Sequence, residues 1–362
     1  MAVKGSAVLE TKDLTVNFRT YRGEVKALDK VGLQLFEHEV LALVGESGCG
    51  KSVTALTILG LLPQNAYVLG GQILFKGEDL LRKSQEQMCE IRANYIAAIF
   101  QDPMTFMNPV LTVGLQLKEA FQVQRDLSIP GHRNESGEVS GGGITDFLLK
   151  RSVSEYDSSH KMSGRERERV AGDLSKKILD LVRLPDAVRI LKEYPHELSG
   201  GMRQRCMIAM ALARRPSIIV ADEITTALDV TVQAQILKLL KELRDSIDAS
   251  TILITHDLSV AAETADRIAV MYAGNVVEVA DTKELFKNAL HPYTQLLMKC
   301  IPDVRKPVEH LESIKGSVPD LIDPPLGCRF HPRCPFVMDV CRVQKPMQKD
   351  MGNGHLVHCK LY

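Results

Sequence analysis

The pattern of apolar and polar positions along the chain predicts strands that alternate with helices. Runs in which nearly every side chain is apolar are typical of strands buried on both faces of a parallel sheet. Such runs stand at residues 40–44, 96–100, 217–221, 251–254 and 267–271. Between the third and fourth runs, one face of a predicted helix carries Val232, Ile236, Leu239, Leu240 and Leu243. The alternation predicts an α/β fold with a mostly parallel sheet covered by helices.

Other stretches predict structure that flanks this sheet. Strand patterns at 8–11 and 31–36 are separated by a turn at 21–24, and a glycine-bounded strand follows at 70–77. Apolar residues at helical spacing begin at Val113 and, after a polar insertion at about 125–169, resume at Leu174. This second part is therefore predicted to be helical, with an exposed insertion that is loop or partly helical.

Composition and charge narrow the class of protein. The chain has 362 residues, 45% of them hydrophobic and 25% charged, which fits one large domain with a smaller one. The formal net charge is zero and so gives no argument for a nucleic-acid partner. No stretch approaches the ~18 apolar residues of a membrane-spanning helix, and the N-terminal residues lack the apolar core of a signal peptide. We expect a soluble cytoplasmic chain.

The segment from Gly45 to Ser52 carries the first chemical signal. It matches G-x-x-x-x-G-K-[ST] and lies between an apolar strand and a predicted helix. Glycines let backbone N–H groups turn inward, and the helix N-terminus adds positive potential, so the segment predicts a phosphate loop. Lys51 would reach the β- and γ-phosphates, and Ser52 would hold Mg²⁺. The predicted nucleotide ligands are Gly45, Glu46, Ser47, Gly48, Cys49, Gly50, Lys51, Ser52 and Val53.

Polar residues at three other strand ends are candidates for the same site, because ligands of open α/β sheets lie beyond the carboxyl ends of the strands. Gln101 follows one strand, and Asp222 and Glu223 follow another. Asp222 could bind Mg²⁺ through water, and Glu223 could polarise an attacking water. His256 ends a third strand and could contact the γ-phosphate, although a histidine in such a place is also often a cap or a packed ring.

The stretch from Leu198 to Arg205 distinguishes this chain from a generic nucleotide hydrolase. Ser199, Gly200 and Gly201 open a predicted helix and would present bare N–H groups to an anion. The alternative is an ordinary loop with a serine N-cap, which is a common feature. That alternative does not explain why the stretch stands just ahead of the acidic strand end.

Together these motifs resemble the ATP-binding cassette (ABC) family over residues 8–285. The ordered set is the phosphate loop at 45–52, Gln101, the signature at 198–204, Asp222 with Glu223, residues 227–229 and His256. The resemblance implies an ABC-type P-loop NTPase with an antiparallel β subdomain and a helical subdomain at about 102–215. It implies ATP as ligand, Mg²⁺ held by Ser52, Gln101 and Asp222, and Glu223 as general base.

In that family two cassettes face each other, and the signature of one closes on the ATP held by the other. The resemblance therefore implies a second cassette as partner. Tyr21 resembles the aromatic residue that stacks on adenine, with Phe18 as a rival. Ile224 departs from the family, in which proline usually follows the glutamate, and should loosen the turn.

Finer agreement resembles the ATP-binding subunits of oligopeptide, dipeptide and nickel importers. It covers residues 45–48, 100–105, 194–205, 227–235 and 291–294. This implies an ATPase that energises peptide import from the cytoplasmic face of the membrane. The implied partners are a paralogous ATPase subunit, two integral membrane permease subunits and, indirectly, an extracytoplasmic solute-binding protein, with no nucleic acid. Residues 104–108 would meet a membrane subunit.

Other functions compete with peptide import. One is import of nickel or another small solute, because selectivity belongs to other subunits. Another is a soluble ABC ATPase acting on ribosomes or DNA, but such proteins usually carry two cassettes or a long coiled coil, and sustained heptads are absent from this sequence. A small-molecule kinase or GTPase would share the phosphate loop but has no use for the signature.

Residues 286–362 are predicted to form an appended extension with a metal site. Four of the eight cysteines lie within 32 residues of this extension: Cys328, Cys334, Cys341 and Cys359. Gaps of five, six and seventeen residues fit zinc poorly, whereas an iron–sulfur cluster tolerates looser spacing; His331 and His358 keep zinc open. Similar tails in the importer branch are taken to hold a [4Fe–4S] cluster. We expect the metal to act as a staple, because a short Pro- and Gly-rich tail buries little surface.

Overall fold

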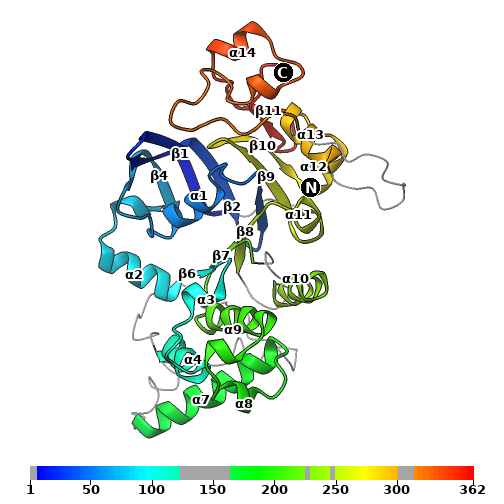
Figure 1. Ribbon diagram of the computed structural model, residues 1–362. Coiled ribbons are helices and arrows are strands. Elements are labelled where there is room, and N and C mark those ends of the chain that lie inside the picture. The colour runs from blue at the N-terminus through cyan, green and yellow to red at the C-terminus, as the bar shows by residue number, and fades with distance from the viewer. Residues whose placement is uncertain (1–5, 123–163, 225–228, 245–248, 301–313) are drawn as a thin grey trace. The chain divides into compact units, whose positions relative to one another are not determined.

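The computed structural model (Figure 1) describes residues 6–122, 164–224, 229–244, 249–300 and 314–362. The chain divides into two compact units, residues 1–88 with 250–362 and residues 89–249. Most of the predicted polar insertion at 125–169 lies outside the described residues. The division at residue 285 between a cassette and an extension stays a prediction.

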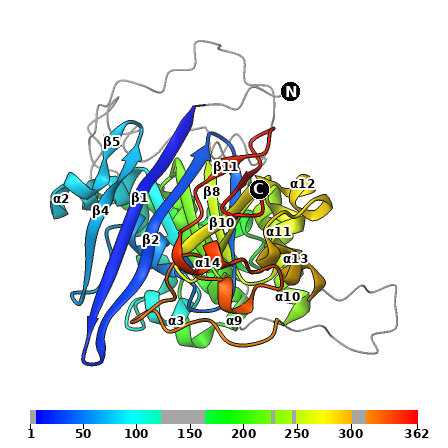
Figure 2. The same ribbon diagram turned by 90° about the horizontal axis from the view of Figure 1, so that it is seen from above.

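The first unit contains an antiparallel sheet in the order β2-β1-β4-β5. Its two longest strands form a hairpin whose turn is Tyr21 and Arg22, and Figure 2 shows them side by side. Alternate side chains of this hairpin, such as Leu14 and Val31, are fully buried. The strand patterns predicted at residues 8–11 and 31–36 are confirmed. The strands are β1 (Ala7–Thr20), β2 (Gly23–Phe36), β4 (Ala66–Phe75) and β5 (Glu78–Asp79).

A second sheet in this unit has β3 (Val40–Val44) between two parallel neighbours, β8 (Ser250–Thr255) and β9 (Arg267–Tyr272). Every residue of β3 is buried, as expected for a strand covered on both faces. The sheet continues from β9 through three antiparallel strands that the sequence pattern did not identify. These are β10 (Asn275–Asp281), β12 (Leu356–Val357) and β11 (Lys349–Asp350).

Helices flank these sheets. In the first unit they are α1 (Lys51–Ile58), η1 (Leu80–Arg82), α11 (Leu258–Thr264), α12 (Thr282–Lys287), α13 (Pro292–Lys299), η3 (His331–Arg333) and α14 (Asp339–Val343). Helix α2 (Gln85–Asn94) spans the sequence boundary between the units.

The C-terminal residues bury more apolar surface than expected. Tyr293 and Phe330 are at most 1% exposed, and their rings pack against Tyr272 of β9 with centroid distances of 4.7 and 5.0 Å. Val357 of β12 is also fully buried. The expectation that this tail buries too little surface to order itself is therefore wrong, because it shares the core of the first unit.

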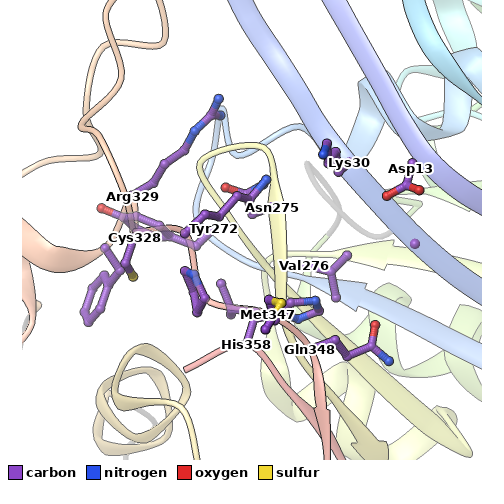
Figure 3. A pocket seen from close by; sticks show the side chains of 16 residues that line it. Asp13, Lys30, Tyr272, Asn275, Val276, Cys328, Arg329, Met347, Gln348 and His358 are labelled. Carbon is purple, nitrogen blue, oxygen red and sulfur yellow. The ribbon is translucent and has the colours of Figure 1, made fainter. Parts of the chain in front are cut away.

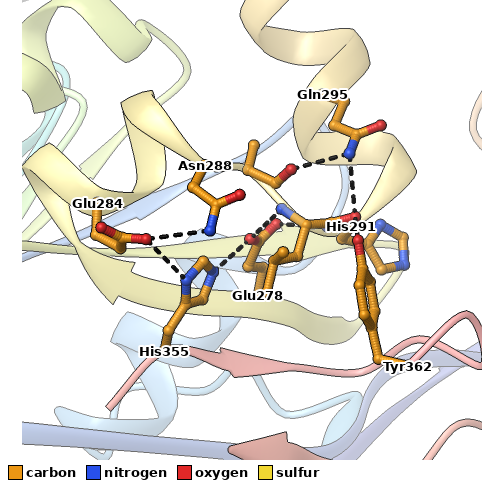
Figure 4. Close-up of polar contacts among 9 residues, drawn as sticks. Glu278, Glu284, Asn288, His291, Gln295, His355 and Tyr362 are labelled. Carbon is orange, nitrogen blue, oxygen red and sulfur yellow. Dashed lines mark hydrogen bonds and ion pairs between the residues drawn. The ribbon is translucent and has the colours of Figure 1, made fainter. Parts of the chain in front are cut away.

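A buried carboxylate also ties the C-terminal strand to β10 (Figure 4). Glu278 is 0% exposed and accepts hydrogen bonds from the backbone N–H groups of Leu290 and His291. The Nε2 atom of His355 lies 2.7 Å from the same carboxylate. Each oxygen of this buried group is thus satisfied, as a buried charge requires. The network joins β10 to the start of α13 and to His355, which is 77 positions further along the chain.

The second unit combines two parallel strands with a set of helices. Strand β6 (Ile96–Ile99) pairs with β7 (Ile218–Asp222) from Ile96 opposite Ile218 to Ile99 opposite Ala221. Its helical core includes Val113, Leu117, Ile178, Val182 and Ile208, each fully buried. The helices are α3 (Pro103–Phe106), α4 (Val113–Gln122), α7 (Gly164–Leu181), α8 (Ala187–Ile190), η2 (Pro195–Glu197), α9 (Gly200–Ala213) and α10 (Val230–Arg244).

Helix α7 begins earlier than the polarity of its sequence indicates. The sequence pattern places residues 164–169 in the polar insertion, and in the structure they form the first turns of this helix. Their charged side chains are exposed where the structure describes them, because the apolar face that packs starts further along. Within the described residues, no helix combines the length and the apolar character needed to cross a membrane.

Candidate functional site: the phosphate loop and the strand ends

The phosphate loop leaves β3 and turns into α1 through three glycines with positive φ. The angles are 155° at Gly45, 76° at Gly48 and 106° at Gly50. A Cβ atom on Gly45 would lie 2.1 Å from the carbonyl oxygen of Met271, and one on Gly50 would lie 2.8 Å from Leu28 Cδ2. A Cβ atom on Gly48 would meet nothing within 4 Å. The loop therefore lies tightly on the sheet at both ends and is open in the middle.

The side chain of Lys51 bonds back to the start of the phosphate loop. Its side chain is buried, and Nζ donates hydrogen bonds to the carbonyl oxygens of Gly45 at 2.9 Å and Glu46 at 3.1 Å. Gly50 is the N-cap of α1 and has no side chain with which to cap it. An uncapped helix start of this kind can be satisfied by a phosphate group.

The remaining loop residues divide by exposure. Ser47 and Ser52 are exposed, Val53 is half-buried, and Cys49 is fully buried beneath the loop. Burial raises the pKa of the Cys49 thiol, with the Lys51 charge acting in the opposite direction. Cys49 is thus a neutral packing residue, whose backbone carbonyl accepts a hydrogen bond from Gly274.

His256 leaves the sheet at the same edge as the phosphate loop. Strand β8 pairs with β3 so that Thr255 stands opposite Val44, and the next residues of the two strands are His256 and Gly45. His256 is exposed there. The structure therefore brings these two predicted elements to one edge of the first unit. Tyr21 lies in the β1–β2 turn and is 97% exposed, so its ring is accessible to a ligand.

In the second unit, Gln101 and the acidic pair also share an edge. Because Ile99 stands opposite Ala221, the residues that follow both strands emerge together. Gln101 is exposed, and Asp222 and Glu223 are half-buried. Glu223 has φ of 46°, a left-handed conformation that costs a non-glycine residue about 1–2 kcal/mol. The chain therefore turns sharply at the glutamate.

Ile224 is 1% exposed directly after this turn. The residue that replaces the usual proline is thus buried. Residues 227 and 228 of the predicted motif at 227–229 lie outside the described part of the chain.

The signature stretch begins helix α9 as predicted. Ser199 is the N-cap, and its Oγ accepts a hydrogen bond from the backbone N–H of Met202 at 3.3 Å. The serine is exposed, and Gly200 and Gly201 form the first turn. A Cβ atom on Gly201 would lie 2.8 Å from Val232 Cγ1, so glycine allows α10 to pack closely. Ser199 is therefore a cap and is also accessible to a ligand.

Exposed apolar side chains follow Gln101. Met104 is 39% exposed, Phe106 53% and Val110 75%. The ring of Phe106 stacks on Phe100 at a centroid distance of 3.8 Å, which fixes helix α3 against the end of β6. A cluster of apolar side chains in water is typical of a protein–protein contact.

The cysteines of the C-terminal segment, residues 286–362, do not form a recognisable metal site. Burial raises the pKa of the Cys328 thiol to about 11. The backbone N–H of Cys328 donates a hydrogen bond to the carbonyl oxygen of Cys341 at 2.8 Å. All four thiols are free of disulfides. Among the described residues, however, no three His, Cys, Asp or Glu side chains form a group that could hold a metal ion. The structure thus does not support the predicted cluster.

A pocket of about 400 Å³ lies beside this segment. Figure 3 shows Lys30 from β2, Asn275 from the start of β10 and Arg329 from the C-terminal segment around it. Arg329 and Lys345, which both line the pocket, form ion pairs with Asp29 at 3.4 and 2.8 Å. These two cations therefore share one carboxylate, and the two ion pairs hold the C-terminal segment on the hairpin.

Two further residues contact the phosphate loop, and no local sequence pattern identified them. Arg333 forms an ion pair with Glu46, and the Tyr293 hydroxyl accepts a hydrogen bond from the Glu46 N–H. Arg333 and Glu46 are 287 positions apart in the sequence. Such pairs depend on the tertiary fold, so periodicity carries no signal of them.

Comparison with known proteins places these features in context. Residues 28–226 match the sequence model of the ABC transporter family, and residues 277–341 match the C-terminal region of oligopeptide/dipeptide transporters. The dipeptide transport ATP-binding protein DppD of Bacillus subtilis is 45% identical over 355 residues, which cover 98% of this chain and 94% of that protein. The oligopeptide transport ATP-binding protein AppD of the same organism is 40% identical over 358 residues, covering 99% and 97%.

A solved structure has a similar fold. It is the dimeric post-hydrolysis state of the ATP-binding cassette MJ0796 bound to ADP and phosphate. Its TM-score is 0.57 at 26% sequence identity, and the match covers 76% of this chain and 98% of that one.

Proposed function

This chain belongs to the ABC transporter family of ATP-binding proteins, and from that membership we propose that it hydrolyses ATP to energise the import of peptides across the cytoplasmic membrane. The observation that carries the ATPase assignment is the phosphate loop, in which buried Lys51 bridges the turn ahead of an uncapped helix start. The choice of di- or oligopeptides as solute is supported by the match of residues 277–341 and by the names of the relatives.

The first unit would bind the nucleotide. Lys51 and the backbone N–H groups around Gly48 would hold the β- and γ-phosphates, because the middle of the loop is open and the helix start is uncapped. His256 would contact the γ-phosphate, since it leaves the sheet at the edge where the loop begins. Tyr21 would stack on adenine, a role that its exposure permits.

Mg²⁺ would be held by Ser52, Gln101 and Asp222, whose oxygen atoms are the ligands that this ion prefers. When bound, the ion would neutralise charge that develops on the phosphates. Glu223 would take a proton from the attacking water as general base. Its position at a sharp turn directly after β7 supports this role, because the turn holds the carboxylate at the strand end.

The signature residues Ser199, Gly200 and Gly201 would bind the ATP that a second cassette holds. The exposure of Ser199 at the start of α9 supports this, since an accessible helix N-terminus is suited to an anion. The MJ0796 cassette of the comparison is dimeric. We propose a paralogue as the partner of this chain.

The complex would also contain two membrane permease subunits and would receive peptide from an extracytoplasmic binding protein. For the predicted contact of residues 104–108 with a permease on the cytoplasmic face of the membrane, the exposure of Met104 and Phe106 is the support. Purification of the native complex tests the assignment. The chain should co-purify with integral membrane proteins, and deletion should abolish uptake of labelled dipeptide. Co-purification with nucleic acid, or loss of nickel uptake alone, would contradict it.

The cysteines of the extension would hold a [4Fe–4S] cluster. Thiolates are its usual ligands, and the proposal rests on the sequence, in which these four cysteines lie within 32 residues. The purified chain should contain iron and acid-labile sulfide and show a visible absorption band that dithionite bleaches. Cys334→Ser should lower the iron content, and Cys89→Ser, which changes an exposed cysteine elsewhere, should not. Colourless protein with stoichiometric zinc would contradict the proposal.

A further inference from the structure

We propose that Arg333 and Tyr293 of the C-terminal segment are positioning residues for the phosphate loop, so that this segment sets the affinity for ATP. The inference rests on the proposed function and deepens it. Under this proposal the C-terminal segment helps to position the residues that bind ATP. Both residues act through one loop residue, Glu46.

The first contact is a bidentate ion pair. Nη1 and Nη2 of Arg333 lie 2.7 and 3.0 Å from the two carboxylate oxygens of Glu46. The Arg333 side chain is 5% exposed and that of Glu46 is 29% exposed. A forked, charge-assisted pair of this kind fixes both distance and orientation, and its partial burial limits screening by salt.

Arg333 is itself held in place by other groups. Its Nε donates to the carbonyl oxygen of Lys315 at 3.0 Å, and Nη2 donates to that of Ile314 at 3.2 Å. Nη1 also donates to the Tyr272 hydroxyl at 3.4 Å. These bonds hold the guanidinium in one position, so it restrains the carboxylate of Glu46.

The second contact holds the backbone of the same residue. The Tyr293 hydroxyl accepts a hydrogen bond from the Glu46 N–H at 3.0 Å. The Tyr293 ring is fully buried and packs against Tyr272 and Phe330. Burial raises the pKa of Tyr293, so the hydroxyl stays neutral and keeps this geometry at physiological pH.

These contacts reach the reactive lysine through one more bond. The carbonyl oxygen of Glu46 accepts a hydrogen bond from Lys51 Nζ at 3.1 Å. The side chain and the N–H of Glu46 thus each have a partner in the C-terminal segment, and its carbonyl accepts from Lys51 and from the backbone N–H of Cys49. Glu46 therefore anchors the loop.

The segment is attached to the first unit independently of Arg333. Arg329 donates to the carbonyl oxygens of Lys26 and Ala273, and Lys345 pairs with Asp29. The pairing of β12 with β10 adds a further attachment. Removal of Arg333 alone should therefore leave the segment docked and change mainly the loop.

Calorimetric titration of the purified full chain with MgATP tests the inference. Arg333→Met should weaken ATP affinity about tenfold, the cost of a lost charge-assisted contact. Arg333→Lys should recover part of the loss, because lysine keeps the charge but not the fork. Arg342→Met, which removes an exposed cation of the same segment, should leave the affinity unchanged. The double variant E46Q/R333M should bind no more weakly than R333M, since both changes break one contact.

In the assembled ATPase, R333M should raise KM for ATP and leave kcat unchanged, which a general loss of folded protein would not produce. Equal ATP affinity of R333M and wild type would overturn the inference. So would additive effects of E46Q and R333M. If R333M fails to fold, the milder variants E46Q and Y293F decide in the same titration. Failure of the wild-type chain to bind ATP would overturn the proposed function itself.

Discussion

Replacing Glu223 by glutamine is expected to lower ATP turnover about 10²–10⁴-fold, the usual contribution of a positioned general base, and to leave ATP binding intact. The amide has nearly the same shape as the carboxylate, so it can occupy the same half-buried position after β7. It cannot accept a proton from water at neutral pH. The measurement is kcat and KM for ATP in the assembled transporter, together with ATP affinity of the isolated chain.

A matched control separates the role of Glu223 from a general effect of charge removal. Glu242 lies in α10 of the same unit and pairs with Arg183 on the surface. Glu242→Gln should therefore keep normal turnover, because exposed ion pairs contribute little. Full turnover of the Glu223→Gln transporter would refute the role of Glu223 as general base.

The parts of the site that the sequence predicted are those set by local structure. The order of apolar strand, glycine loop and helix is continuous along the chain, so the loop and its geometry follow from residues that are neighbours in sequence. The same holds for Gln101, which stands two residues after β6, and for Asp222, which is the last residue of β7. Their common edge then results from parallel pairing, which apolar runs of this kind predict.

The parts that were missed depend on distant segments. Strand β10 has the buried Glu278 among its apolar residues, and its antiparallel partners are β9 and the far C-terminal β12. The buried residues of the C-terminal segment, such as Phe330, stand singly among polar neighbours and show no period. The pairing of Arg333 with Glu46 is likewise a tertiary event. The sequence shows an arginine between two cysteines, but periodicity cannot indicate which carboxylate it will meet.

Ser199 can cap helix α9 and also belong to an anion-binding site. Capping uses the side-chain oxygen and one N–H, at Met202. The other N–H groups of the first turn of α9 still point out of the helix start, as at any helix N-terminus. A cap and an anion site are thus compatible at the same helix, and the sequence could not have separated them.

Replacing Gly45 by alanine is expected to lower ATP affinity about 10²-fold, the usual cost of misplacing a binding group by about 1 Å. The new Cβ atom would lie 2.1 Å from the Met271 carbonyl oxygen, so the loop must leave β9. The Gly45 carbonyl that holds Lys51 would move with it. Gly77→Ala is the matched control, because Gly77 also has positive φ, 86°, but its Cβ atom would meet nothing within 4 Å.

Both variants carry the strain of an alanine in a glycine conformation, about 1 kcal/mol, and both should unfold at a slightly lower temperature. Only Gly45→Ala should also lose ATP affinity in calorimetric titration. Its Cβ atom clashes with β9, and the phosphate loop must move to remove the clash, whereas the Cβ atom at residue 77 clashes with nothing. Wild-type affinity in Gly45→Ala would mean that the loop does not need its contact with β9 to bind phosphate. A loss of affinity in Gly77→Ala as well would assign the effect to general destabilisation of the first unit, to which both glycines belong.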